Sequence, residues 1–352
     1  MRWTLTEDQE LFRDSFRGWL ERFASTEAVR GWLDSGDPSD FERRFVDEGW
    51  FAIGSPEERG GQGGGLVELA LAAEQLGGSA APSAAWAAAV VAAPLLGGAP
   101  DLAARSLGSG EFAVLAVNSD RPLDAGGALT RVGGTVPNVL GADRARRFLV
   151  PVRDDGRLSL TVVDATEVEL VHRRLLDRSR SVADVVVPDL ARYDGIELAD
   201  EHLTDAALRA AVLVAADSLG AAERMLTMAV DYSKQRHQFG VPIGSFQAVK
   251  HAAATMLVSV ESARSLIYYA AASVDQRHDD AALHAAAAKA QACAGAERAA
   301  DSALTMHGAI GYTWEHDLHL FYKRAKLDLR LFGSPKAWNE RLAAALPLVP
   351  AA

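Results

Sequence analysis

Long alanine-rich stretches in the last third of the chain are the feature that most limits which folds it can adopt. Between residues 204 and 348 the apolar residues recur at helical spacing, and alanine dominates residues 252–272 and 281–303. Alanine has the highest helix propensity, and its small side chain allows two helices to pack closely. The sequence therefore predicts an antiparallel helical bundle as a C-terminal domain over 201–352, with Thr204 as the N-cap of its first helix.

The first part of the chain, residues 1–110, is predicted to be a second helical domain. Thr6 and Gln9 have the spacing of a capping box, in which the two side chains bond the first free amides of a helix. Apolar and aromatic residues then follow at helical spacing. Further helices are predicted over 41–50, 66–77 and 82–107.

Residues 111–200 have a different character. Gly126-Gly127 and Gly133-Gly134 are typical of turns, and they separate short runs that are rich in β-branched residues. These runs are the predicted strands 112–117, 147–152, 158–163 and 182–187. The sequence therefore predicts an α+β protein in which a small middle β domain joins two helical domains.

Composition narrows the class of protein. The net charge of −11 disfavours nucleic acid and anionic membranes as partners. The single cysteine, Cys293, excludes an internal disulfide and is expected to be a buried thiol. The apolar run over 80–96 is short and contains Pro82 and Pro94, so we expect a buried helix and no membrane span. With no signal peptide over 1–11, the expected location is the cytoplasm.

The most specific motif lies over residues 236–251. Gly240 and Pro242 predict that a helix ends here, and Ser245 is the predicted cap of the next helix. Arg236 lies at the end of the first helix, where two roles are open to it. Its guanidinium either interacts with the C-terminal helix dipole or binds a diphosphate through two hydrogen bonds.

A second motif lies over residues 307–319. Gly308 and Gly311 allow the backbone to approach a ligand closely. Several side chains invite a metal site, namely those of His307, Glu315, His316, Asp317 and His319. We predict no metal, because successive residues at a helix start point in different directions and acidic residues there are ordinary partners of the helix dipole.

These motifs resemble those of the acyl-CoA dehydrogenase family. Residues 236–251 are similar to the family segment Arg-x-Gln-Phe-Gly-x-Pro-Ile-x-x-Phe-Gln, and residues 305–311 to its Gln-x-x-Gly-Gly-x-Gly loop. Residues 314–326 and 56–64 resemble two further family stretches. The resemblance implies a helical N-terminal domain, a β-barrel-like middle domain and a C-terminal four-helix bundle. It also implies FAD-dependent α,β-desaturation of an acyl-CoA, with electron-transfer flavoprotein or a similar acceptor.

The resemblance further implies that FAD is bound across a subunit interface. In the family, the two motifs contact the diphosphate and adenosine of a neighbouring subunit's FAD. The positions that correspond to them here are Arg236, Gln238, Phe239, Gln247, Thr305, Gly308, Ala309 and Gly311. Thr305 stands where the family has Gln, and Ala309 stands where it has Gly, so a hydrogen-bond partner for the cofactor is shortened or lost there.

The expected catalytic base is missing. Removal of the α-proton requires a base within hydrogen-bond reach, and a carboxylate suits this step. The family has a Glu at one of two positions, which Phe332 and Ala210 occupy here. The family's Thr-Glu-Pro loop beside the flavin ring is also absent between residues 118 and 136. Asp217, two turns after Ala210, is either a relocated base or a partner in helix packing.

The chain thus resembles the short, base-lacking subunit of α2β2 acyl-CoA dehydrogenases. In that interpretation it completes the FAD site of a longer paralogue that carries the Glu. Two other interpretations stay open. The chain is either a self-sufficient homo-oligomeric dehydrogenase with an unusual base, or a flavin-free structural or binding protein on the same scaffold.

Overall fold

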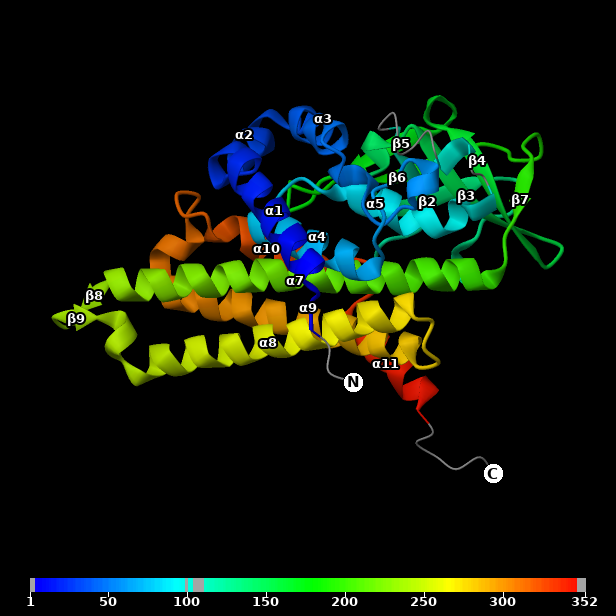
Figure 1. Ribbon diagram of the computed structural model, residues 1–352. Coiled ribbons are helices and arrows are strands. Elements are labelled where there is room, and N and C mark those ends of the chain that lie inside the picture. The colour runs from blue at the N-terminus through cyan, green and yellow to red at the C-terminus, as the bar shows by residue number, and fades with distance from the viewer. Residues whose placement is uncertain (1–3, 99–100, 104–110, 347–352) are drawn as a thin grey trace.

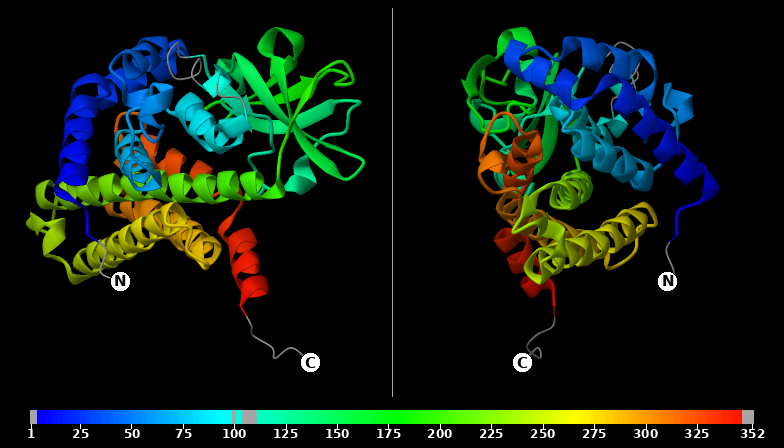
Figure 2. Two further views of the ribbon diagram at one scale, coloured as in Figure 1. Left: turned by 45° about the vertical axis from the view of Figure 1, so that its right-hand side comes forward. Right: turned by 90° about the vertical axis from the view of Figure 1, so that its left-hand side faces the viewer.

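The computed structural model describes residues 4–98, 101–103 and 111–346. Figure 1 shows that the N-terminal helices and the strands lie side by side along one side of the long helix α7 (Asp200–Gln235). The helices α8 and α9 lie on the other side of α7. Figure 2 shows the same arrangement from two other directions. Helix α7 therefore contacts the N-terminal helices on one side and the other bundle helices on the opposite side.

The N-terminal part is helical, as predicted, and its helices are α1 (Glu7–Phe23), α2 (Thr26–Ser35), α3 (Ser39–Asp47), α4 (Leu66–Ser79) and α5 (Ala84–Ala92). The predicted capping box is confirmed, since Gln9 N–H donates to Thr6 Oγ1 at 3.2 Å and Thr6 N–H donates to Gln9 Oε1 at 3.0 Å. The predicted helix over 82–107 ends early. Pro94 follows α5, and Ala93–Gly98 form a 3-10 turn; residues 104–107 lie outside the described ranges.

Helices α4 and α7 cross in backbone contact. A Cβ atom on Gly77 would lie 2.0 Å from the carbonyl oxygen of Asp217, and one on Gly220 would lie 1.8 Å from that of Glu74. Only glycine fits at such a crossing. The N-terminus of α4 is held from α8 as well, because the carboxylate of Asp275 accepts hydrogen bonds from the amides of Leu66 and Val67. The N-terminal helices and the bundle are therefore firmly joined.

The middle part contains the strands β1 (Ala113–Leu115), β2 (Gly134–Leu140), β3 (Arg147–Asp154), β4 (Arg157–Asp164), β5 (Glu169–Arg173), β6 (Val182–Val187) and β7 (Gly195–Glu197). They form one sheet in the order β1-β3-β4-β7 and another in the order β2-β6-β5. Across the described residues the two sheets do not close into a barrel. The four predicted strands are confirmed, whereas β2, β5 and β7 were not predicted.

The C-terminal part is the predicted antiparallel bundle, built from α7, α8 (Gln247–Asp275), α9 (Ala281–His307) and α10 (Leu318–Asp328), with α11 (Pro335–Ala345) packed on α9. Two predicted caps are wrong. Helix α7 begins at Asp200, and the hydroxyl of Thr204 donates to Asp200 O one turn back. Helix α8 begins after Phe246, and the hydroxyl of Ser245 donates to Pro242 O.

The interior agrees with the predictions from composition. Cys293 is a buried free thiol on α9. Within the described ranges, every helix is too short or too polar to cross a membrane.

Candidate functional site

A tight hairpin projects from the bundle between α7 and α8. Its strands are β8 (His237–Gln238) and β9 (Val241–Pro242), and Figure 1 shows them at the far end of the bundle. The two central residues, Phe239 and Gly240, have φ of 53° and 81°, as a two-residue turn between paired strands requires. The Phe239 side chain is 93% exposed. Such an exposed aromatic ring is typical of a contact surface.

The Arg236 side chain stands at the base of this hairpin. Helix α7 ends at Gln235, so Arg236 is its C-cap residue. Its backbone is fixed, because the carbonyl oxygen of Arg236 accepts a hydrogen bond of 2.8 Å from Ile243 N–H. The guanidinium is exposed, and across the described residues it makes no hydrogen bond or ion pair. By contrast, the nearby Lys234 ammonium is paired with Asp231 at 3.0 Å.

The second predicted loop begins where α9 ends. Gly308 has φ of 65°, and it starts the 3-10 turn Gly308–Tyr312. A Cβ atom on Gly311 would lie 3.0 Å from the Cβ of His307 and 3.1 Å from Leu304, so glycine is required to keep this turn compact. The Thr305 hydroxyl donates to Asp301 O of its own helix at 2.8 Å. Its oxygen still faces solvent, since Thr305 is exposed.

The two loops meet at one end of the bundle. The ring of Tyr232 on α7 stacks on that of His307 on α9, with centroids 4.7 Å apart, and the His316 ring lies 4.5 Å from His307. Burial lowers the pKa of His307, which keeps this aromatic contact neutral. We name residues 236–247 and 305–314 the bundle tip. Seven of its eight predicted cofactor residues are exposed, and Gly311 is buried; the exposed seven are Arg236, Gln238, Phe239, Gln247, Thr305, Gly308 and Ala309.

The bundle tip also carries exposed apolar rings. Phe239 and Phe246 contact edge to face at 6.1 Å on the first loop, and Tyr312 and Trp314 are exposed on the second loop. Together with the partnerless guanidinium, these rings form a surface suited to another protein chain or a ligand. Throughout the described part of the chain, no three histidine, cysteine or acidic side chains are grouped as metal ligands.

Ala210 and Phe332, the two positions at which a base is expected from the sequence, are closed off from solvent. Ala210 is fully buried in α7, and Phe332 is 3% exposed. The amide of Phe332 donates to Ser119 O at 2.5 Å, and its carbonyl oxygen accepts from Trp338 Nε1 at 2.8 Å. A Cβ atom on Gly333 would lie 2.6 Å from Pro122. The turn around Phe332 therefore packs directly on the segment that contains Ser119 and Pro122.

Asp217, the alternative base, lies in a buried charge network. Its carboxylate is paired with Arg180 at 2.5 Å and with Arg324 at 3.1 Å. Burial raises the pKa of Asp217, but the two guanidinium groups outweigh it and hold the pKa below its usual value. Asp328 beside it has a raised pKa, because burial and the charge of Asp217 both favour its neutral form. This geometry favours the role in helix packing, since both oxygens of Asp217 are engaged.

The fold and the bundle tip define a class. A helical domain, a small β part and an antiparallel bundle with two glycine turns at its end form the scaffold of an acyl-CoA dehydrogenase-type flavoprotein. The family description "Acyl-CoA dehydrogenase, C-terminal domain" matches residues 194–345, and "Acyl-CoA dehydrogenase, N-terminal domain" matches residues 6–106. The chain belongs to the acyl-CoA dehydrogenase family of oxidoreductases, which confirms the resemblance in the motifs.

Named relatives agree with this assignment. Acyl-CoA dehydrogenase IpdE2 of Mycolicibacterium smegmatis is 34% identical over 346 residues, covering 97% of this chain and 99% of that protein. Acyl-CoA dehydrogenase FadE34 of Mycobacterium tuberculosis is 33% identical over 353 residues, covering 97% of this chain and 48% of that protein. A chain of the ChsE4–ChsE5 complex from Mycobacterium tuberculosis has the same fold, with a TM-score of 0.86 at 24% identity. The match covers 100% of this chain and 100% of that chain.

Proposed function

We propose that this chain is a subunit of an FAD-dependent acyl-CoA dehydrogenase and that its bundle tip completes the FAD site of a partner chain. The observation that carries the proposal is a difference between two groups of residues in this chain, those of the bundle tip and those around Phe332. Residues that would serve a neighbour's cofactor stand exposed, while the position of its own base is packed shut by the Phe332–Ser119 hydrogen bond.

The bundle tip suits the diphosphate half of the cofactor. The free guanidinium of Arg236 offers parallel N–H donors of the geometry that phosphate oxygens accept. Gly308 leaves its surroundings open, since a Cβ atom there would meet nothing within 4 Å. Exposed Gln238 and Gln247 add neutral donors nearby. These residues would hold the cofactor at a subunit boundary, while Phe239 and Trp314 provide apolar contact with the partner.

The flavin-ring half of the site does not fit within this chain. A planar ring between two protein walls needs roughly 7 Å between their atoms, twice the contact distance of about 3.5 Å. The base turn and the segment after β1 are instead joined by the bond of 2.5 Å between Phe332 N and Ser119 O. Bonds from Ser119 to Asn138 O fix the other side of this contact. The ring, the thioester and the base are therefore assigned to the partner.

When bound, FAD would accept the β-hydride of the acyl thioester. The base for the α-proton would come from the partner, which we infer to be a longer paralogue with the Glu in place. The ChsE4–ChsE5 structure of the same fold is a complex of two proteins, which supports a heteromeric assembly. By family resemblance, the electron acceptor would be electron-transfer flavoprotein or a similar carrier.

The test is to purify the chain alone and together with the paralogue encoded beside it, and to compare flavin absorbance and acyl-CoA oxidation. We expect colour and turnover only in the co-purified complex. Flavin retained by the chain alone, with turnover, would instead identify a self-sufficient homo-oligomer. Absence of flavin from both preparations would identify a flavin-free scaffold protein.

A matched pair of variants connects the cofactor to the bundle tip. Arg236→Gln in the complex should raise the dissociation constant for FAD by roughly tenfold, and so lower flavin content when free FAD is below that constant, because a charge-assisted contact is lost. Lys234→Gln removes a cation two residues away that is already paired with Asp231, and it should leave flavin content unchanged. Equal flavin content in both variants would place the cofactor elsewhere.

A further inference from the structure

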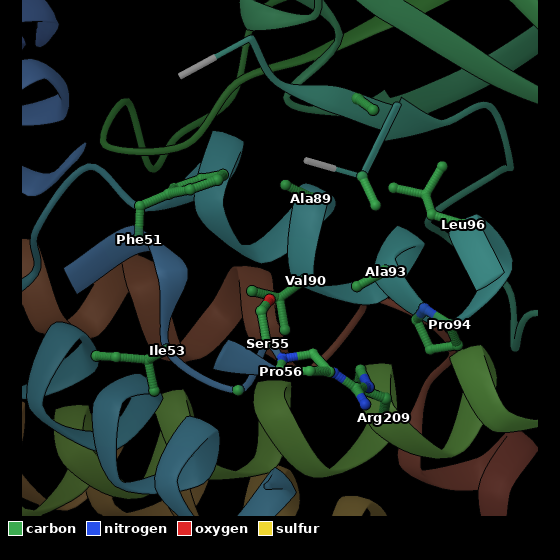
Figure 3. A pocket seen from close by; sticks show the side chains of 13 residues that line it. Phe51, Ile53, Ser55, Pro56, Ala89, Val90, Ala93, Pro94, Leu96 and Arg209 are labelled. Carbon is green, nitrogen blue, oxygen red and sulfur yellow. The ribbon is translucent and has the colours of Figure 1, made fainter. Parts of the chain in front are cut away.

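A separate pocket lies on the other side of the molecule from the bundle tip, between the N-terminal helices and the start of α7. Its volume is about 250 Å³, just below the range of roughly 300–1,000 Å³ that is usual for small-molecule sites. Figure 3 shows side chains of the 51–56 loop, α5 and the following turn around it, with Arg209 of α7 beside Pro56. The apolar walls are formed by Phe51, Ile53, Ala89, Val90, Ala93 and Leu96.

Arg209 is the one charged side chain among the described residues that line this pocket. Within the described ranges its guanidinium makes no hydrogen bond or ion pair, although it is partly buried. Burial lowers its pKa, and the charges of Asp275 and Asp205 oppose this only through space. The Asp275 carboxylate is occupied by the amides of Leu66 and Val67 at the start of α4. Among the described residues, the cation therefore lacks a counterion of its own.

A desolvated cation without a partner is costly, so its place in an apolar pocket calls for a complementary anion. The polar neighbour on the wall is Ser55, whose hydroxyl makes no hydrogen bond across the described residues. A guanidinium and a hydroxyl can together bind one carboxylate. A polyanion such as a diphosphate would need more donors than this pocket offers, and the apolar walls would exclude its hydration.

We propose that this pocket binds an apolar molecule that carries a single carboxylate, with the carboxylate on Arg209 and the apolar part against α5 and Phe51. The pocket shares no residue with the bundle tip, so this proposal does not rest on the FAD site. Two sources of the ligand have the same chemistry. One is a free medium-chain acid, and the other is an acyl-CoA whose acyl group ends in a carboxylate.

Calorimetric titration of the full chain, purified with its partner where co-expression is needed, distinguishes these sources. The probes are octanoate, 1-octanol, octanoyl-CoA and suberyl-CoA, the last of which has a free terminal carboxylate. We expect octanoate to bind at least roughly tenfold more tightly than 1-octanol. Suberyl-CoA binding more tightly than octanoyl-CoA by a similar factor would assign the site to the acyl end of a thioester. Equal binding of octanoate and 1-octanol, together with equal binding of the two thioesters, would overturn the proposal.

Three variants test whether octanoate binds in this pocket. Arg209→Met keeps the aliphatic stem and should weaken octanoate binding by roughly tenfold or more, while Arg209→Lys should lose less. Ala89→Leu fills the apolar end and should weaken binding although Arg209 is intact. Arg209→Met should also raise the melting temperature of the ligand-free protein, because an uncompensated cation is removed. If octanoate affinity is unchanged in both Arg209→Met and Ala89→Leu, the pocket is not the binding site.

Discussion

The buried charge network around Asp217 permits a quantitative prediction for the variant Asp217→Asn. Loss of the carboxylate charge leaves Arg180, at 2.5 Å from Asp217, with Asp328 as its remaining acidic neighbour at 3.9 Å. The charge of Asp217 is one cause of the raised pKa of Asp328, so that pKa falls in the variant and the Asp328 carboxylate can replace part of the lost charge. The Arg324 guanidinium keeps Asp177 at 3.1 Å. Arg180 is therefore the group that loses most, because its remaining partner lies farther away.

Removal of one partner from a buried ion pair costs roughly 3–5 kcal/mol in the free energy of unfolding. The lower end of about 3 kcal/mol applies here, because Asn still accepts a hydrogen bond and Asp177 still compensates Arg324. For a chain of this size that corresponds to a fall in melting temperature of roughly 4 °C. Urea unfolding followed by circular dichroism and differential scanning calorimetry measures both quantities.

The exposed pair Lys234–Asp231 provides the control, since Asp231→Asn should change stability by less than about 1 kcal/mol. Acid pH gives a second check on Asp217. Its folded-state pKa is lowered, so its contribution is present above the unfolded pKa of about 3.9 and is lost as pH falls through the folded pKa. The difference in stability between the wild type and Asp217→Asn should therefore begin to shrink below about pH 4 and vanish only below the folded-state pKa. A variant as stable as wild type at pH 7, but without turnover in the complex, would refute this reasoning and restore Asp217 as a base.

Two further predictions concern His319, near the start of α10, and Gly220, where α4 and α7 cross. The pKa of His319 is lowered to about 4 by burial and by the nearby Lys323, so the unfolded chain binds an extra proton between about pH 4 and 6.5. Stability should fall as pH drops through that window, and His319→Gln should flatten the fall in urea midpoints. Gly220→Ala should destabilise the protein by several kcal/mol in chemical unfolding, because its Cβ would lie 1.8 Å from Glu74 O. Gly18→Ala, with open space at its Cβ, should be neutral or stabilising by up to about 1 kcal/mol; equal effects would contradict the backbone contact.

Local signals in the sequence predicted the helices well and their first residues poorly. Alanine-rich periodicity is a property of neighbouring residues, so the lengths of α8 and α9 could be read directly. The start of α7 could not, because its first turn is placed by Leu203, which is buried against the rest of the protein. Thr204 has the residue type of a cap, but its hydroxyl bonds its own helix.

The missed strands lack the pattern that prediction requires. Strand β2 contains Pro137 and a register shift between Val136 and Val139, with Asn138 at φ of 53°. Strand β5 is mostly exposed and polar, so no alternation of apolar residues marks it. Both strands exist because β6 pairs with each of them, which is a long-range contact that no short window of sequence contains.

The same distinction applies to the candidate functional residues. The turns at Gly240 and Gly308 are determined locally, and the structure brings both to one end of the bundle. Arg209 could not be recognised as a pocket residue from the sequence, because it lies within an ordinary helical pattern and the other residues of the pocket are distant in the chain. Asp217 was open to two roles for the same reason. Its partners Arg180 and Arg324 lie 37 and 107 positions away in the sequence.

The packing at Phe332 has a consequence for the evolution of the chain. A single codon change to glutamate would place a carboxylate in a site that is only 3% exposed, while the amide of that residue stayed committed to Ser119. Desolvation would keep such an acid protonated and ineffective. An ionised carboxylate at this position would require the turn, its side chain and the facing segment to change together. Glutamate at position 332 alone would therefore not supply a working base.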